Sequence, residues 1–147
     1  MSEAIDQAFI DATLNGGLGI DVVHENGLYS VWDGSEYTHH TGVYTPDANR
    51  EYCEIRNFPA LRSPFSLSHS DEEMGLFQII LKYPADVGAH TIKAKAEEAL
   101  SLFTAGGKLT YSGQDTFIES KNRDGGRIEG GFYQIVIRVN YRAFVSR

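Results

Sequence analysis

The stretch that decides the fold runs from residue 81 to residue 111 and reads LKYPADVGAHTIKAKAEEALSLFTAGGKLTY. An apolar strand pattern ends at Pro84, and another begins at Lys108, after paired glycines. Between them, apolar residues recur at helical spacing, at Ile92, Ala96, Ala99, Leu100 and Phe103. This spacing predicts a helix with one apolar face, so we expect the helix to pack on a sheet with Phe103 in the core.

The turn between this strand and this helix, residues 84–89, raises the question of a phosphate site, because helix N-termini after glycine turns often bind phosphate. The turn has one glycine and an aspartate, Asp86, and lacks the spacing of the P-loop and of the dinucleotide fingerprint. An aspartate repels phosphate, whereas its carboxylate accepts hydrogen bonds from the first N–H groups of a helix. We therefore interpret the turn as structural, with Asp86 as the helix N-cap.

Further strand patterns lie on both sides of this stretch. Residues 51–58 and 74–83 place apolar side chains on one face, and residues 132–145 alternate between an apolar and a polar face, as in a half-solvated antiparallel strand. The polar face of this last strand carries Gln134, Arg138, Asn140 and Arg142. A shorter strand is predicted at 65–70, followed by a turn at 71–73, and residues 108–111 and 116–120 are predicted to form one strand region with a bend at Gly113.

The N-terminal region predicts a second, shorter helix. Ile5, Phe9 and Ala12 form one apolar stripe within residues 2–14, and extended structure follows in residues 19–32, with a turn at Asn26 and Gly27. Together the patterns predict one α+β domain, residues 1–147, in which an antiparallel or mixed sheet carries one main helix and the shorter N-terminal helix.

Two polar, glycine-containing segments, 33–50 and 121–131, are predicted to be long loops because they have no sustained period. Trp32, Tyr37 and Tyr44 lie in or beside the first segment. Aromatic residues with a polar tip often anchor interfaces, so these three are candidate protein-interface residues. The alternative is that they fold back on their own domain.

Arg123 and Arg127 in the second segment are also candidate interface residues. In an assembly of several copies they could meet acidic residues of the next copy, such as Glu97 and Glu98, and opposite charges would then set register and orientation. The alternative is a solvated hairpin tip, where such charges contribute little.

Neither the composition nor the motifs indicate a catalytic, cofactor-binding or metal site. The chain has 147 residues and a net charge of −7, which disfavours binding to nucleic acid. Cys53, the only cysteine, excludes an internal disulfide and is predicted to be a buried, inert thiol. The adjacent His39 and His40 are predicted to be solvated, since no further ligands lie at a familiar metal-site spacing. We expect no catalytic, cofactor-binding or metal site, no membrane span and no signal peptide.

The order of these elements resembles a known family. Residues 51–109, EYCEIRNFPALRSPFSLSHSDEEMGLFQIILKYPADVGAHTIKAKAEEALSLFTAGGKL, followed later by GFYQIVIRVNYRAFV, resemble the tail terminator proteins of phages with long noncontractile tails. The resemblance rests on the glycine-opened strand GLFQIILKYP, the helix that closes on LFTAGGKL, and a final strand that ends in YRA. It covers roughly residues 50–145, with a weaker echo in the first helix and in VHENGLY, and it does not extend to 33–50.

The resemblance implies a structural virion protein that is not an enzyme and needs no cofactor. Such proteins form a hexameric ring on the last ring of tail tube protein, stop tube polymerisation and dock the head through a head-completion or connector protein. DNA passes through the ring without specific binding. The implied location is the head-proximal end of the tail, reached after assembly in the host cytoplasm. The alternatives are another neck or tail protein, such as a head-completion protein or a tail tube subunit, and a small-molecule-binding α+β protein.

Overall fold

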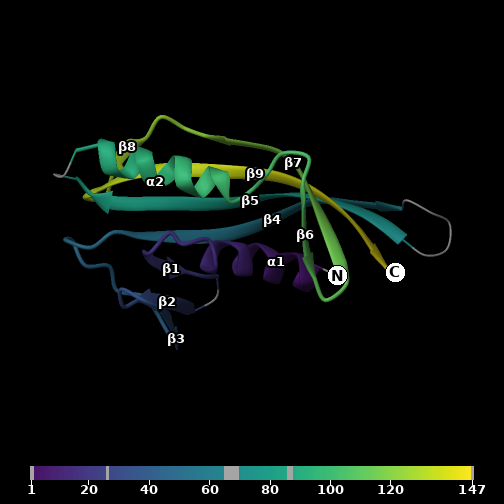
Figure 1. Ribbon diagram of the computed structural model, residues 1–147, viewed down its shortest axis with the longest axis horizontal. Helices are drawn as coiled ribbons and strands as arrows, with labels where there is room; N and C mark the ends of the chain where they lie inside the picture. The colour runs from purple at the N-terminus through teal and green to yellow at the C-terminus, as the bar shows by residue number, and fades with distance from the viewer. Residues whose placement is uncertain (1, 26, 65–69, 86–87, 147) are drawn as a thin grey trace.

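The computed structural model describes residues 2–25, 27–64, 70–85 and 88–146. Within these residues the chain forms two helices and nine strands (Figure 1). In chain order they are α1 (Ser2–Leu14), β1 (Asp21–Val23), β2 (Leu28–Trp32), β3 (Tyr37–Thr41), β4 (Tyr52–Pro64), β5 (Ser70–Pro84), α2 (His90–Ser101), β6 (Lys108–Tyr111), β7 (Gln114–Arg123), β8 (Arg127–Glu129) and β9 (Phe132–Ser146).

The strands form one mixed sheet in the order β3-β2-β1-β4-β5-β9-β7-β6, and β8 pairs with the start of β9 beside β7. β1 and β4 run parallel, and every other pair of neighbouring strands is antiparallel. The long strands β4, β5 and β9 form the centre because their alternating side chains give the sheet one apolar face. The prediction of an α+β fold with a mixed sheet and two helices is therefore confirmed.

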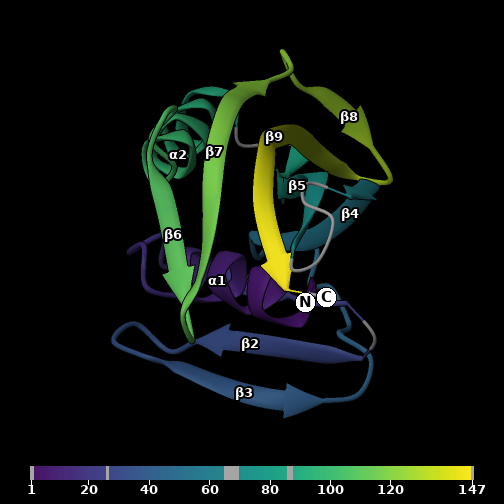
Figure 2. The same cartoon turned by 90° about the vertical axis from the view of Figure 1, so that its right-hand side faces the viewer.

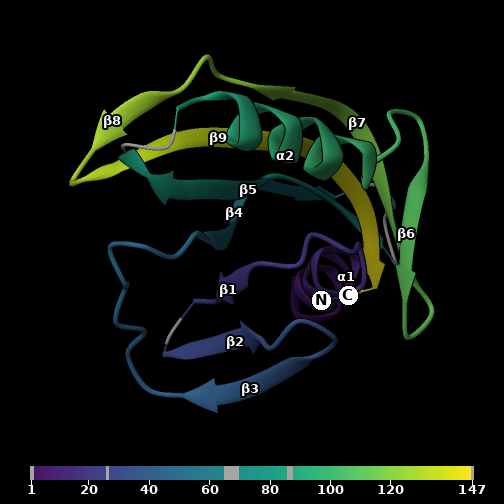
Figure 3. The ribbon, with the colours of Figure 1, turned by 60° about the vertical axis from the view of Figure 1, so that its left-hand side comes forward.

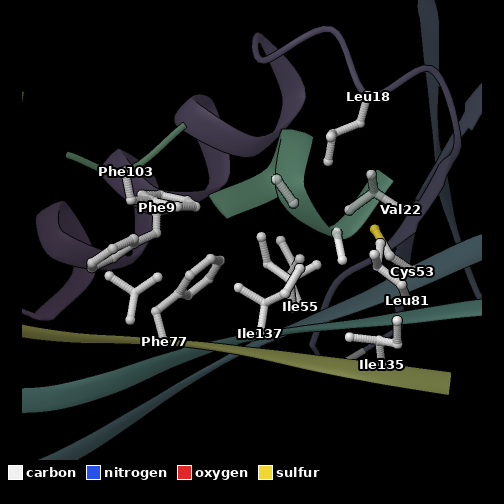
Figure 4. Packing of buried hydrophobic residues seen from close by; sticks show 14 of the residues in the cluster. Phe9, Leu18, Val22, Cys53, Ile55, Phe77, Leu81, Phe103, Ile135 and Ile137 are labelled. Atoms are coloured by element: carbon white, nitrogen blue, oxygen red, sulfur yellow. The ribbon is translucent and has the colours of Figure 1, made fainter. Parts of the chain in front are cut away.

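Both helices pack on the same face of the sheet, and the core lies between them and the strands. Phe77 of β5 stacks on Phe9 of α1 with ring centroids 4.5 Å apart, and Phe103, just beyond α2, lies 5.9 Å from both rings. Figure 4 shows these three rings at one end of the core and Cys53 at the other. Phe103 is completely buried, as its place on the apolar helix face predicted.

Neither of these helices covers the opposite face of the sheet (Figure 2). The strand register places Arg56, Gln78 and Arg138 in one row across β4, β5 and β9 on that face. At one end of it, Tyr44 packs on Tyr52 with ring centroids 5.0 Å apart, so the segment that follows β3 covers this corner.

The segment 33–50 contains a strand that the prediction of a loop missed. Residues 37–41 form β3, which pairs with β2. Tyr37 lies opposite Trp32 at one end of the pair, and Thr41 lies opposite Leu28 at the other. Residues 38–41 are all polar, so the sequence shows no alternation of apolar and polar side chains there. Polar side chains nevertheless suit the exposed edge strand that the structure shows. His39 and His40 therefore lie on a strand, with one side chain on each face.

Three other local predictions differ from the structure. The acidic residues 71–73 were predicted to form a turn, but they lie within β5, where Glu73 faces inward and is buried. Residues 121–123 end β7 and 127–129 form β8, so the second predicted loop is short. The residue before α2 is Ala89, which makes no side-chain cap hydrogen bond. Asp86, Asn26 and the predicted strand residues 65–69 lie outside the described residues.

Candidate assembly interface

Asp21 organises the end of the sheet where the candidate aromatic residues lie. Its carboxylate is buried and accepts hydrogen bonds from Arg50 Nε and Nη2 at 2.8 and 2.7 Å, from the Trp32 backbone N–H at 2.9 Å and from the Tyr44 hydroxyl at 2.8 Å. Burial raises the pKa of Asp21, but the hydrogen bonds from Arg50, Trp32 and Tyr44 together bring the pKa below its ordinary value of 3.8. The charged carboxylate thus fastens residues 44 and 50, and with them the segment after β3, to β1.

The three candidate aromatic residues contact their own domain. The rings of Trp32 and Tyr37 lie 5.0 Å apart, and the Tyr37 hydroxyl donates to the Ile20 carbonyl at 2.8 Å. Burial raises the pKa of Tyr37 to about 12. Tyr44 packs between Tyr29 and Tyr52. Each of these candidates therefore has a structural role inside the subunit, whatever part its exposed edge takes in assembly.

The two candidate arginines lie at the other end of the molecule, near β8 (Figure 3). Arg123 Nε forms an ion pair with Glu97 Oε1 of its own α2 at 3.2 Å, and Arg123 Nη1 donates to the Asp124 carbonyl. Arg127 pairs with Glu129 at 3.4 Å, and both side chains are exposed. The structure therefore brings the three aromatic residues together and separates them from the arginines.

A groove that sequence reasoning missed lies between α1 and the β2–β3 hairpin. Two adjoining hollows of about 150 and 270 Å³ form it, and they share three lining residues. We call this surface the α1–hairpin groove; its shared residues are Ile10, His24 and Leu28. Ile55 and Phe77 form the base of the smaller hollow, and the acidic lining residues are Asp6, Asp11 and Glu25. The one signal in the sequence was Leu28, an apolar residue beside a turn, which is 48% exposed.

A buried serine joins two histidines beside this groove. Ser30 Oγ lies 2.8 Å from His24 Nε2 and 2.7 Å from His39 Nδ1. Burial lowers the pKa of His24, and the nearby charge of His39 lowers it further. The next residue, His40, stacks on Tyr29 with ring centroids 5.1 Å apart. His39 and His40 are both exposed, as predicted, but each also contacts a residue of β2.

The structure offers no obvious chemical centre among the residues it describes. Cys53 is completely buried, and burial raises the pKa of its thiol well above the usual range, which suits the predicted inert role. In the described part of the chain, no group of three or more His, Cys, Asp and Glu side chains is arranged to hold a metal ion. No helix within the ranges 2–25, 27–64, 70–85 and 88–146 is long and apolar enough to cross a membrane.

The sequence profile of a phage tail terminator protein family matches residues 10–141. Among curated proteins, no relative matches the chain. A solved structure superposes with a TM-score of 0.71 at 16% identity, covering 97% of this chain and 95% of that one, and at this identity the likeness shows the fold alone. The profile match extends from α1 to β9 and so takes in the elements that build the core. This chain belongs to the phage tail terminator family and is a structural protein of the phage tail.

Proposed function

We propose that this tail protein assembles as a hexameric ring on the head-proximal end of the tail tube. The ring stops further polymerisation of the tube protein and provides the surface on which the head-completion or connector protein docks. DNA passes through the ring without specific binding. The observation that carries the proposal is the family match over residues 10–141.

The shape and charge of the subunit suit this role. A ring of identical subunits needs a heterologous contact, in which two different patches of the same chain meet. The candidate aromatic cluster and the candidate arginines lie at different ends of the fold (Figure 3), as such a contact requires. The net charge of −7 disfavours tight binding to phosphates, so DNA could move past the protein without being held. On this proposal the protein assembles in the host cytoplasm and remains at the head-proximal end of the virion tail.

Deleting the gene from the phage and imaging the lysate by electron microscopy tests the proposal. We expect full heads without tails, together with tail tubes of uncontrolled length, and we expect expression of the protein from a plasmid to restore normal particles. Normal infectious particles in the deletion would refute it. Absence of all tubes would identify a tube subunit instead, and tails of normal length beside unjoined heads would identify a head-completion protein.

A further inference from the structure

The charge of the chain is divided between two ends of the fold. The 49 residues before Arg50 hold eight Asp and Glu and no Lys or Arg, whereas residues 120–138 hold four Lys and Arg and two Asp and Glu. The first set builds α1 and β1–β3, and the second builds the end of β7, β8 and the start of β9. Figures 2 and 3 both place α1 and the β2–β3 hairpin at one end of the molecule and β8 at the other. Two copies therefore attract each other head to tail and repel when like ends meet.

The α1–hairpin groove is the hollow part of the acidic end. Its smaller hollow has about 150 Å³ over an apolar base, a volume in which a cavity can hold a benzene-sized group. Acidic side chains lie around the apolar part, at Asp6, Asp11 and Glu25, together with the basic Arg56. An apolar pocket enclosed by a polar rim is the arrangement in which one anchoring side chain contributes most to an interface.

β8 carries the side chain that matches this pocket. Ile128 is 67% exposed, and it lies on a three-residue strand between two pairs of glycines, so it projects from the basic end with little around it. Arg127 beside it is also exposed. Val43 is also strongly exposed, but it lines a hollow together with Leu28 and so belongs to the acidic end itself.

We propose that the ring contact is formed by β8 of one copy and the α1–hairpin groove of the next, with Ile128 inserted between Ile10 and Leu28. Successive strand residues point to opposite faces, so Arg127 and Glu129 stay outside the pocket while Ile128 enters it. Arg127 then lies near the acidic rim, which fixes the direction of the contact. Because groove and strand are different patches, each copy uses both, and the contacts close into a ring when the rotation from one copy to the next divides a full turn. This inference rests on the proposed function and assigns its self-association surface.

Cysteine cross-linking of the whole protein tests the contact directly, because Cys53 is completely buried and gives little background. Purified Leu28→Cys and Ile128→Cys proteins are mixed with isolated tail tubes and oxidised. We expect a disulfide-linked dimer only when both variants are present, and a ladder that ends at the closed ring for the double variant. Phe117→Cys, at an exposed position on β7, is the matched control and should not cross-link to Leu28→Cys.

A second pair of variants separates this contact from the ring itself. Ile128→Asp should weaken ring formation on tube ends at least about tenfold, since a charge cannot enter an apolar pocket. Ile128→Leu keeps an apolar side chain and should assemble like the wild type, and both variants should fold because the position is exposed. If wild-type rings form normally but Leu28→Cys and Ile128→Cys do not cross-link, this contact is overturned and the proposed function is left intact. The same holds if Ile128→Asp forms rings as well as the wild type does. Wild-type protein that forms no ring on tubes would overturn both.

Discussion

A single buried carboxylate determines where the segment after β3 lies. Asp21 is 2% exposed, and its two oxygens accept from the Arg50 guanidinium and the Tyr44 hydroxyl, both in the segment after β3, and from the Trp32 backbone N–H of β2. The segment 42–51 has no helix or strand of its own, so its position depends on Tyr44 and Arg50 reaching this group. The interaction is charge-assisted and bidentate at Arg50, which is the strong form of such contacts.

Replacing Asp21 should therefore destabilise the protein. We expect Asp21→Ala to lower the free energy of unfolding by about 2–3 kcal/mol, because several donors lose a charged acceptor at once. Urea unfolding followed by circular dichroism measures this change. Asp47→Ala in the same segment is the control, because its exposed carboxylate accepts from the Asn49 N–H only locally, and its unfolding midpoint should barely move. An equal, small effect of both substitutions would contradict the assigned role.

His24 should make the stability depend on pH near neutrality. Burial lowers the pKa of His24 below its ordinary value of 6.5, so the unfolded chain binds a proton there at higher pH than the folded chain does. The stabilisation by neutral His24 is present above about pH 6.5 and is lost as the pH falls toward the folded-state pKa. Unfolding free energies measured at about pH 7 and about pH 5.5 should decrease on acidification. His24→Gln, which removes the titration, should reduce this decrease, and an unchanged pH slope would refute the assignment.

Among the elements, β5 depends on one close approach. Gly75 lies opposite Tyr141 of β9, and the Tyr141 hydroxyl donates to Asn57 Oδ1 of β4 at 2.7 Å, so the ring crosses directly over the glycine. A Cβ at Gly75 would lie 2.6 Å from Tyr141 Cζ and 2.9 Å from the Phe58 carbonyl oxygen. The glycine is therefore required by packing between strands, since its φ is not in the left-handed region.

Gly75→Ala should consequently cost about 1–3 kcal/mol of unfolding free energy through overpacking. Gly125→Ala offers a matched control, because a Cβ there meets no atom within 4 Å and the backbone is again outside the left-handed region. Thermal unfolding of the two variants compares them under the same conditions. If Gly75→Ala melts at the wild-type temperature, the ring of Tyr141 can move aside and the close approach has no energetic consequence.

The elements that the sequence predicted are those with a clear period. Apolar residues recur regularly in 92–103 and 132–145, and the structure buries most of the residues that the pattern selects, including Ile92, Phe103 and Ile137, whereas Leu100 and Tyr133 are partly buried. β3 and the first residues of β5 escaped prediction because their side chains are polar on both faces, and acidic runs are typical of turns. Their strands are fixed by pairing with neighbours distant in sequence, which a local pattern does not contain.

The candidate interface was less predictable than the fold. Trp32, Tyr37 and Tyr44 were chosen for their chemistry, and the structure gives each of them contacts within its own subunit. Arg123 pairs with Glu97 on α2 of the same subunit, because β7 and α2 lie side by side in the fold. The groove joins residues of α1 with residues of β2 and β4, so only the folded chain brings them together.

At the scale of the whole molecule, protection against hydrogen exchange should follow the sheet order. β5 and β9 lie in the middle of the sheet and pair on both sides, so their amides should exchange slowest. Residues 42–51 have few backbone partners within the described chain and should exchange fast, with the edge strand β3 between these limits. Exchange of the isolated subunit followed by mass spectrometry measures this order. Uniform protection across the chain would show that the segment after β3 is held as firmly as the core.

The parallel pairing of β1 with β4 has a consequence for the chain as it is synthesised. β1 and α1 leave the ribosome first, yet β1 needs β4 as its neighbour, and α1 packs against rings of β5 and β9. At 5–20 residues per second, the last of these partners emerges on the order of ten seconds after the first. The α1–hairpin groove draws its lining from α1, β2, β4 and β5, so it cannot be complete before β5 has left the ribosome. β8, which follows β5 in the chain, emerges later still, so a nascent subunit gains its groove before the strand that would enter the groove of a neighbour.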